Sequence, residues 1–193
     1  MEANIHLIAH NVFSGISALA LIAIAFFSFT NENRTTAGVT IGLTALAAMT
    51  FIVSHAIGVN IEDPTLSRKV LMFNLSLFFI GAFNVHSALA AVGEDKERKR
   101  FIIFIYASTA ALVGFFLWQP DMFLADSTPK MYFPNYYQPG PLNLIRLIFL
   151  NGVCVPYLLY KLLTAYGRAC IPEERNKLKY FIMFMLAGHG MGF

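Results

Sequence analysis

The sequence predicts an all-α fold, a polytopic transmembrane helix bundle, from its composition and from the lengths of its apolar stretches. Of its 193 residues, 57% are hydrophobic and 13% are charged, and the mean hydropathy is +0.60. Charged residues make up about a quarter of an ordinary soluble domain. A helix needs about 20 predominantly apolar residues to cross the hydrocarbon core of a bilayer, and such stretches account for nearly the whole chain. Its expected environment and first partner is therefore the lipid bilayer.

Six transmembrane helices are predicted, separated by short polar connections. Their ranges are 5–29, 36–58, 70–92, 101–118, 142–166 and 178–193. The longest interruption, 119–141, contains five of the eight prolines together with a cluster of aromatic residues. Because this composition does not suit the interior of a bilayer, we expect the segment to form an aromatic, proline-rich loop that caps one end of the bundle.

The third and fifth predicted helices carry residues that indicate how the bundle packs. Asn74, Gly81 and Asn84 are unusual on a lipid-facing surface, so this side of the third helix is expected to point into the bundle. Pro156 lies inside the fifth helix, where it removes one backbone donor and leaves the carbonyl of Gly152 short of a partner. A kink is expected there, and Gly152 and Pro156 form the expected conformational pivot.

A small-residue face is predicted on the second helix. Gly38, Gly42, Ala45 and Ala48 recur there at near-helical spacing. Such a face lets a neighbouring helix approach closely and gain van der Waals contact where lipid offers no hydrophobic driving force. Chance spacing in an alanine-rich span is the alternative.

The distribution of Lys and Arg predicts that the N-terminus lies outside the cell. With that orientation ten of the 14 basic residues face the cytoplasm, as the positive-inside rule requires. The four on the outer side are Arg68, Lys69, Lys130 and Arg146. The loop 119–141 is then expected to face outside.

Several classes of function are disfavoured. The basic residues cluster beside the predicted helices rather than in a patch interleaved with aromatic residues, so nucleic acid is not an expected partner. The sequence contains no GxSxG, HExxH, P-loop or glycine-rich dinucleotide motif, and no catalytic activity is expected from this chain. A transporter or channel is disfavoured because no acidic residue lies within a predicted span and no internal repeat is evident.

Histidines provide one candidate for cofactor chemistry. His10 and His55 fall near the outer ends of the first and second helices, and His189 lies in the sixth. Imidazoles on neighbouring helices could ligate a haem b or a metal ion, whereas His86 lies in the inner half and would belong to another site. The alternatives are that the histidines hydrogen-bond within the bundle or make it sensitive to pH. No cofactor is expected under the main interpretation.

Aromatic residues near the cap provide a second candidate, a ligand-binding site. Its residues would be Trp118, Tyr132, Tyr136, Tyr137 and Arg146. Aromatic faces beside a cation could line a pocket for a small amphiphilic or anionic ligand at the membrane surface. The alternative is an interfacial aromatic belt that only sets the depth of the bundle in the membrane.

Three segments of the chain are similar to a known family. They are RKVLMFNLSLFFIGAFNVHSALAAVGED, NYYQPGPLNLI and PEERNKLKYFIMFMLAGHGMGF. Their order and hydropathy resemble the N-terminal seven-helix membrane region of bacterial histidine kinases and related signalling proteins. The resemblance covers most of the chain and is strongest from Ser67 onward. It rests on hydropathy and a few glycines, prolines and aromatic residues, not on catalytic residues.

The resemblance implies a sensor domain in the inner (plasma) membrane that passes a signal from an unidentified outer ligand to a cytoplasmic kinase. It also implies a seventh helix and an output domain, through which the protein would form a homodimer, so this chain is expected to be part of a longer one. His189 departs from the family pattern, which usually has an apolar residue there. The alternative from another class is a small redox protein that binds haem b.

Overall fold

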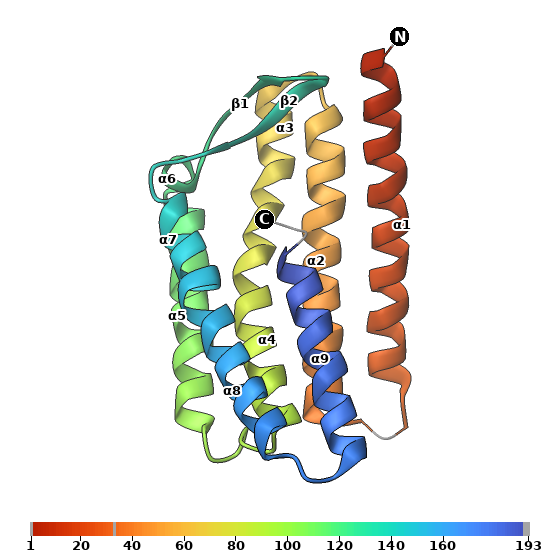
Figure 1. The fold of residues 1–193 in the computed structure, drawn as a ribbon. Helices are drawn as coiled ribbons and strands as arrows, with labels where there is room; N and C mark the ends of the chain where they lie inside the picture. The colour runs from red at the N-terminus through yellow and green to blue at the C-terminus, as the bar shows by residue number, and fades with distance from the viewer. Residues whose placement is uncertain (1, 33, 191–193) are drawn as a thin grey trace.

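A computed structural model of the chain describes residues 2–32 and 34–190, with side chains described over 5–32 and 34–186. Long helices run roughly side by side, and a β-hairpin lies across one end of them (Figure 1). The α-helices are α1 (Glu2–Thr30), α2 (Thr36–Asn60), α3 (Pro64–Leu71), α4 (Leu77–Ala91), α5 (Lys99–Trp118), α6 (Pro120–Phe123), α7 (Asn143–Leu147), α8 (Val155–Arg168) and α9 (Pro172–Gly190). The 3₁₀ segment η1 (Met72–Ser76) joins α3 to α4, and the π-helical segment η2 (Ile148–Cys154) joins α7 to α8.

Within the described residues, five helices are long and apolar enough to cross a membrane, and the all-α class is confirmed. They are Ile5–Thr30, Thr36–Asn60, Pro64–Ala91, Lys99–Trp118 and Asn143–Arg168. The third begins at Pro64, earlier than expected, because the Asp63 carboxylate caps it by accepting from the Leu66 amide. The sixth predicted span, 178–193, lies in α9 and partly outside the described residues, so it stays a prediction.

The predicted loop 119–141 contains regular structure. After α6, strand β1 (Leu124–Lys130) pairs antiparallel with β2 (Phe133–Pro139). The pairing shifts register on both sides of Thr128, and Met131 in the turn has a φ of 56°. Proline is tolerated on edge strands and at bulges, and both strands of a two-stranded sheet are edges. The prolines that indicated a loop are therefore compatible with a hairpin.

The helix formed by α3, η1 and α4 is the centre of the bundle. Of its apolar stretch 61% is buried, against 11% to 22% in the other four spans. Asn74 and Asn84 are buried there and accept hydrogen bonds from Ser54 (3.1 Å) and Thr44 (3.1 Å) on α2. This confirms that this side of the helix faces inward, and the bonds offset the cost of placing amides at membrane depth.

Small residues set the closest helix contacts. A Cβ atom added at Gly81 would lie 3.1 Å from both Cys154 Sγ and Leu150 Cδ1. The backbone of α4 at Gly81 therefore packs directly against these two side chains of η2. On α2, a Cβ at Gly42 would lie 2.9 Å from atoms of Phe29 and Ser28, which leaves no room for a side chain against α1. Gly42 and the buried Ala45 therefore confirm a close-packing face on α2.

The helix distortion expected near Pro156 takes the form of a π-helical segment. The Val155 amide bonds to the Leu150 carbonyl, five residues back, immediately before Pro156. Proline cannot donate to the preceding turn, and the wider π turn is one way a helix accommodates such a break. Gly152 and Pro156 are both exposed on the outside of the bundle.

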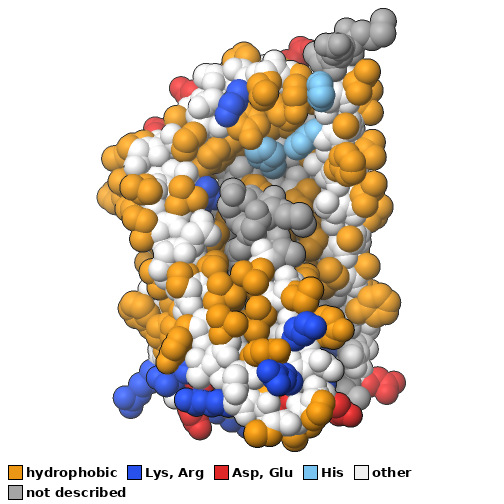
Figure 2. Space-filling view, in the orientation of Figure 1, with side chains coloured by type: hydrophobic (Ala, Val, Ile, Leu, Met, Phe, Trp, Pro, Cys, Tyr) orange, Lys and Arg blue, Asp and Glu red, His pale blue; other side chains and the backbone are white. Residues whose placement is uncertain are grey.

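The two ends of the bundle differ in their charged connections. The hairpin and the α2–α3 turn lie at one end, and the α1–α2, α4–α5 and α8–α9 connections lie at the other (Figure 1). Lys and Arg side chains gather at the end opposite the hairpin (Figure 2). There Glu94 accepts a hydrogen bond from Lys161 of α8 and pairs with Arg98 at 3.6 Å, which ties the α4–α5 connection to α8.

Replacing Gly81 with leucine is expected to destabilise the bundle, because the side chain would have to displace η2. Overpacking of this kind costs about 1–3 kcal/mol. The measurement is thermal unfolding in detergent, followed by circular dichroism. Gly114→Leu is the matched control, since a Cβ there meets nothing within 4 Å. Equal loss of stability in both variants would contradict the packing described for Gly81.

The ion pair of Glu94 is expected to make stability depend on pH. The hydrogen bond from Lys161 lowers the pKa of Glu94, and the charges of Lys161 and Arg98 lower it further against the opposing effect of burial. Because the pKa of Glu94 is lower in the folded protein than in the unfolded chain, its ion pair stabilises the fold at pH values above the unfolded pKa of about 4.3. This stabilisation is lost as the pH falls through the folded-state pKa.

Glu94→Gln should therefore lose about 0.2–1 kcal/mol at pH 7 and show a smaller decline in stability on acidification. Chemical unfolding between pH 7 and pH 3 measures both quantities. Glu97→Gln, at an exposed carboxylate on the same connection, should leave the pH profile unchanged. An identical profile for the two variants would refute the role given to Glu94.

Candidate functional site

The hairpin is fastened to the end of α2 by a buried amide. Asn135 of β2 donates from Nδ2 to the carbonyls of Ile61 and Glu62, both at 2.8 Å. Carbonyls at and just beyond a helix C-terminus have no partner within the helix, so an outside donor satisfies them. Asn135 is 3% exposed, which makes these bonds hard for water to replace. Its position on β2 relative to the α2–α3 turn is therefore fixed.

Arg68 of α3 holds the other side of the cap. It pairs with Asp121 of α6 and with Asp126 of β1 at 3.2 Å, and it donates to the Leu124 carbonyl at 2.9 Å. A guanidinium group serves several acceptors at once because its donors form a rigid fork. The sequence predicts Arg68 only as one of four basic residues on the outer side, because nothing in the chain order indicates that two distant carboxylates converge on it.

A cluster of histidine and aromatic rings lies where the hairpin meets α1 and α2. This histidine–aromatic cluster consists of His6, His10, His55, Tyr132, Phe133 and Tyr136. His side chains are visible beneath the hairpin, on the face shown in Figure 2. The cluster joins three elements: His6 and His10 come from α1, His55 from α2, and the other rings from β2 and the turn before it.

The rings of the cluster are in direct contact. His6 stacks on Tyr132 with centroids 5.3 Å apart, and His10 meets Phe133 edge to face at 5.0 Å. His55 meets Tyr136 edge to face at 5.5 Å. The hairpin is thereby connected through side chains to both of the first two spans.

His10 and His55 face each other within the cluster. Their ring centroids are 6.1 Å apart with an interplanar angle of 69°. His10 Nε2 and His55 Nδ1 are buried and have no hydrogen-bond partner among the described residues. An unsatisfied buried polar atom costs about 1–3 kcal/mol, so these nitrogens favour a group that can bond to them.

The five residues predicted to form one ligand pocket make different side-chain contacts, although Tyr132, Tyr136 and Tyr137 pack against the same hydrophobic core. Tyr132 and Tyr136 belong to the histidine–aromatic cluster. Tyr137 donates to Asn143 Oδ1 at 2.7 Å, and Arg146 donates to the same oxygen at 2.9 Å from Nε. Trp118 is 74% exposed and contacts Phe115, as expected for an interfacial anchor.

The histidines named for the haem alternative are partly brought together. His10 and His55 are neighbours, and the His189 side chain lies outside the described residues. His86 is apart from them and bonds through Nδ1 to Tyr106 Oη at 3.1 Å. Within the described part of the chain, no group of three or more His, Cys, Asp or Glu side chains is gathered to hold a metal ion.

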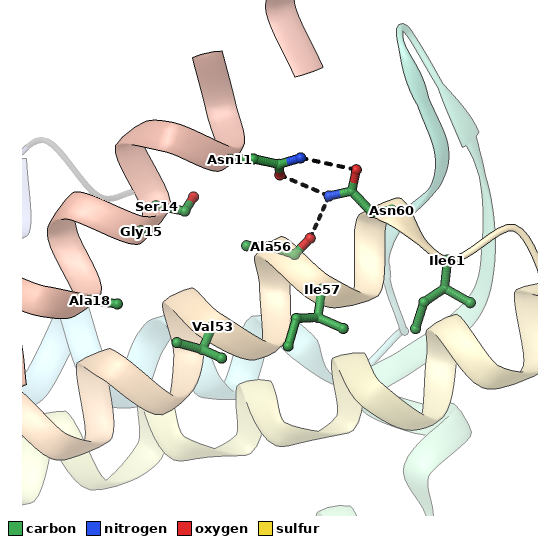
Figure 3. A pocket seen from close by; sticks show the side chains of 9 residues that line it. All are labelled: Asn11, Ser14, Gly15, Ala18, Val53, Ala56, Ile57, Asn60 and Ile61. Atoms are coloured by element: carbon green, nitrogen blue, oxygen red, sulfur yellow. Dashed lines mark hydrogen bonds between the residues drawn. The ribbon is translucent and has the colours of Figure 1, made fainter. Parts of the chain in front are cut away.

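A groove of about 610 Å³ lies between α1 and α2 beside the cluster (Figure 3). At the end of the groove nearest the hairpin, Asn11 and Asn60 exchange two hydrogen bonds, of 3.2 Å and 2.8 Å. Its other walls are mostly apolar or small side chains, from Ser14, Gly15, Ala18, Val53, Ala56, Ile57 and Ile61. Because both helices are candidate spans, the groove is expected to face lipid.

No protein-family model, curated protein or solved structure matches this chain.

Replacing Gly140 with alanine is expected to loosen the hairpin, because the added Cβ would lie 2.5 Å from the backbone carbonyl of Met122. Strain of about 1–3 kcal/mol corresponds to about 5- to 150-fold more frequent opening. Limited trypsin digestion measures this as faster cleavage after Lys130, next to the exposed Met131. Gly167→Ala, where a Cβ meets nothing within 4 Å, serves as control. Cleavage of Gly140→Ala at the wild-type rate would contradict the close packing of Gly140 against the backbone of Met122.

Proposed function

We propose that the chain is the membrane-embedded sensory domain of a histidine-kinase-type signalling protein. In this proposal the hairpin lies outside the cell and receives the signal, and the helices pass it to a cytoplasmic output domain. The observation that carries the proposal is the contact of the hairpin with two spans through the histidine–aromatic cluster. The sequence resemblance supports the same class of protein.

A series of contacts from the hairpin to the π-helical segment supports signal transmission. His55 lies on α2, one residue from Ser54, whose hydroxyl bonds to Asn74 on the central helix. Farther along, Gly81 of that helix packs against Cys154 in the π-helical segment. A π segment beside a proline is a place where a helix can adopt two packings of similar energy. Gly152 and Pro156 are the proposed pivot.

The charge distribution supports the proposed orientation. Ten of the 14 Lys and Arg residues belong to the side proposed to be cytoplasmic, which is the bias expected with the N-terminus and the hairpin outside. The α8–α9 connection, with the exposed Cys170, would then lie in the cytoplasm. Any output domain and homodimer contact would follow α9 and a further helix.

Cys170 allows a direct test of the proposed transmission, because Cys154 is buried and only Cys170 should react readily. The protein is reconstituted in lipid nanodiscs, and the labelling rate of Cys170 by a maleimide is measured. Tyr136→Ala removes an aromatic contact worth about 0.5–1.5 kcal/mol. If the bundle has two packings and the contact is made in only one, their equilibrium constant should change by about two- to tenfold. The labelling rate of Cys170 is expected to change accordingly.

Met131→Ala is the matched control, because Met131 is at the hairpin turn, is 88% exposed and is not part of the cluster. Its labelling rate should equal that of the wild type. If Tyr136→Ala also leaves the rate unchanged while circular dichroism shows a folded protein, the proposal of a sensory domain is wrong.

A further inference from the structure

We propose that His10 and His55 bind a late first-row transition-metal ion, of the zinc and copper type, between the outer ends of α1 and α2. The inference deepens the proposed function by naming the class of ligand, and it rests on that function for the consequence of binding. The binding itself depends only on the two imidazoles and their surroundings.

The spacing of the two rings suits a bridging ion. Their centroids are 6.1 Å apart. A metal–nitrogen bond of about 2.0–2.1 Å, plus about 1 Å from the nitrogen to the ring centre, places each ring centre about 3 Å from an ion, so both rings can reach the same ion. The tetrahedral geometry of zinc requires the two ring centres to move about 1 Å closer together. The torsion that turns a histidine ring is broad, so each ring can present its free nitrogen to the gap.

The chemistry of the free nitrogens favours this class of ion. His10 Nε2 and His55 Nδ1 are both buried and lack a partner within the described chain, and one ion would satisfy both. Neutral imidazole is a preferred ligand of zinc, copper and nickel. Magnesium and calcium prefer carboxylate and carbonyl oxygens, and the six cluster residues include no carboxylate.

His6 is the candidate for a third ligand. It precedes His10 by one helical turn, and two histidines at this spacing on one helix face are a common zinc-binding arrangement. In the structure His6 is stacked on Tyr132 at 5.3 Å, so it must leave that ring to reach the ion. The remaining coordination positions would be taken by water or by an anion from outside.

One nearby charge opposes binding. The ammonium group of Lys130 lies 4.7 Å from the ring centre of Tyr136, which itself contacts His55. Its positive charge repels a cation, so Lys130→Gln should tighten metal binding.

Metal binding would change how the hairpin rests on the bundle. The ion would fix α1 to α2 and draw His55 and His10 away from their contacts with Tyr136 and Phe133. Those contacts connect the hairpin to the spans, so occupancy of the site would be transmitted along the proposed route.

The test uses protein purified without a histidine tag, carrying Cys170→Ser, stripped with a chelator and placed in lipid nanodiscs. Zinc is titrated calorimetrically, and cobalt binding is followed by its visible absorption. One ion per chain is expected. Changes in the outer shell of a metal site already cost about 10- to 100-fold in affinity, so His10→Ala and His55→Ala should each weaken binding at least about 100-fold.

His86→Ala is the matched control, because His86 is hydrogen-bonded to Tyr106 and lies outside the cluster, and it should bind zinc as the parent does. His10→Phe and His55→Phe keep an aromatic ring in place, and circular dichroism checks that each variant is folded. Unchanged zinc affinity in folded His10 and His55 variants would overturn the proposal. A haem absorption band that disappears in His55→Phe would also overturn it, by identifying the pair as haem ligands.

A final measurement separates this inference from the proposed function. Cys170 is retained, and its maleimide labelling rate is measured with and without zinc. Tight zinc binding with no change in labelling supports the metal site and contradicts metal sensing. A change in labelling on Tyr136→Ala without zinc binding supports the sensory domain and overturns the metal site.

Discussion

Two backbone carbonyls at the end of α2 determine how the hairpin end of this protein is assembled. Ile61 and Glu62 cannot find donors within the helix, and Asn135 supplies both hydrogen bonds from the hairpin. Arg68 adds contacts to α6 and β1 from the other side. With the strands held in this way, the aromatic rings of β2 reach the histidines of α1 and α2. The candidate site therefore depends on helix-end chemistry as much as on its own residues.

The same requirement for satisfied polar groups organises the centre of the bundle. Asn74 and Asn84 are tolerated because Ser54 and Thr44 donate to them across the α2–α4 interface. Glycines at the tightest contacts let the backbones approach, as at Gly81 against Cys154. Bonds and close contacts of this kind are specific, so they fix which helix faces meet where lipid supplies no hydrophobic force between helices.

His10 and His55 depart from this pattern of satisfied polar groups, as do Ser76, Thr109 and the Nε atom of Arg68 among the described residues. The free nitrogens of the two histidines are buried without a partner in the described part of the chain, while the amides around them are bonded. Sites that a protein leaves unsatisfied are often those at which it binds something else. The position of the pair between two spans and the hairpin is where a bound ion would affect all three elements.

The sequence alone determined the all-α class, the presence of five long apolar helices, the inward face of the central helix and the distortion near Pro156, because each follows from local composition or from proline chemistry. The sixth span and the orientation stay predictions. Only the tertiary structure decided that 119–141 contains α6 and a hairpin, that Arg68 meets two distant carboxylates, and that Tyr132 and Tyr136 contact histidines while Tyr137 and Arg146 bond to Asn143. These outcomes depend on contacts between residues far apart in the chain, and local patterns carry no information about which of them meet.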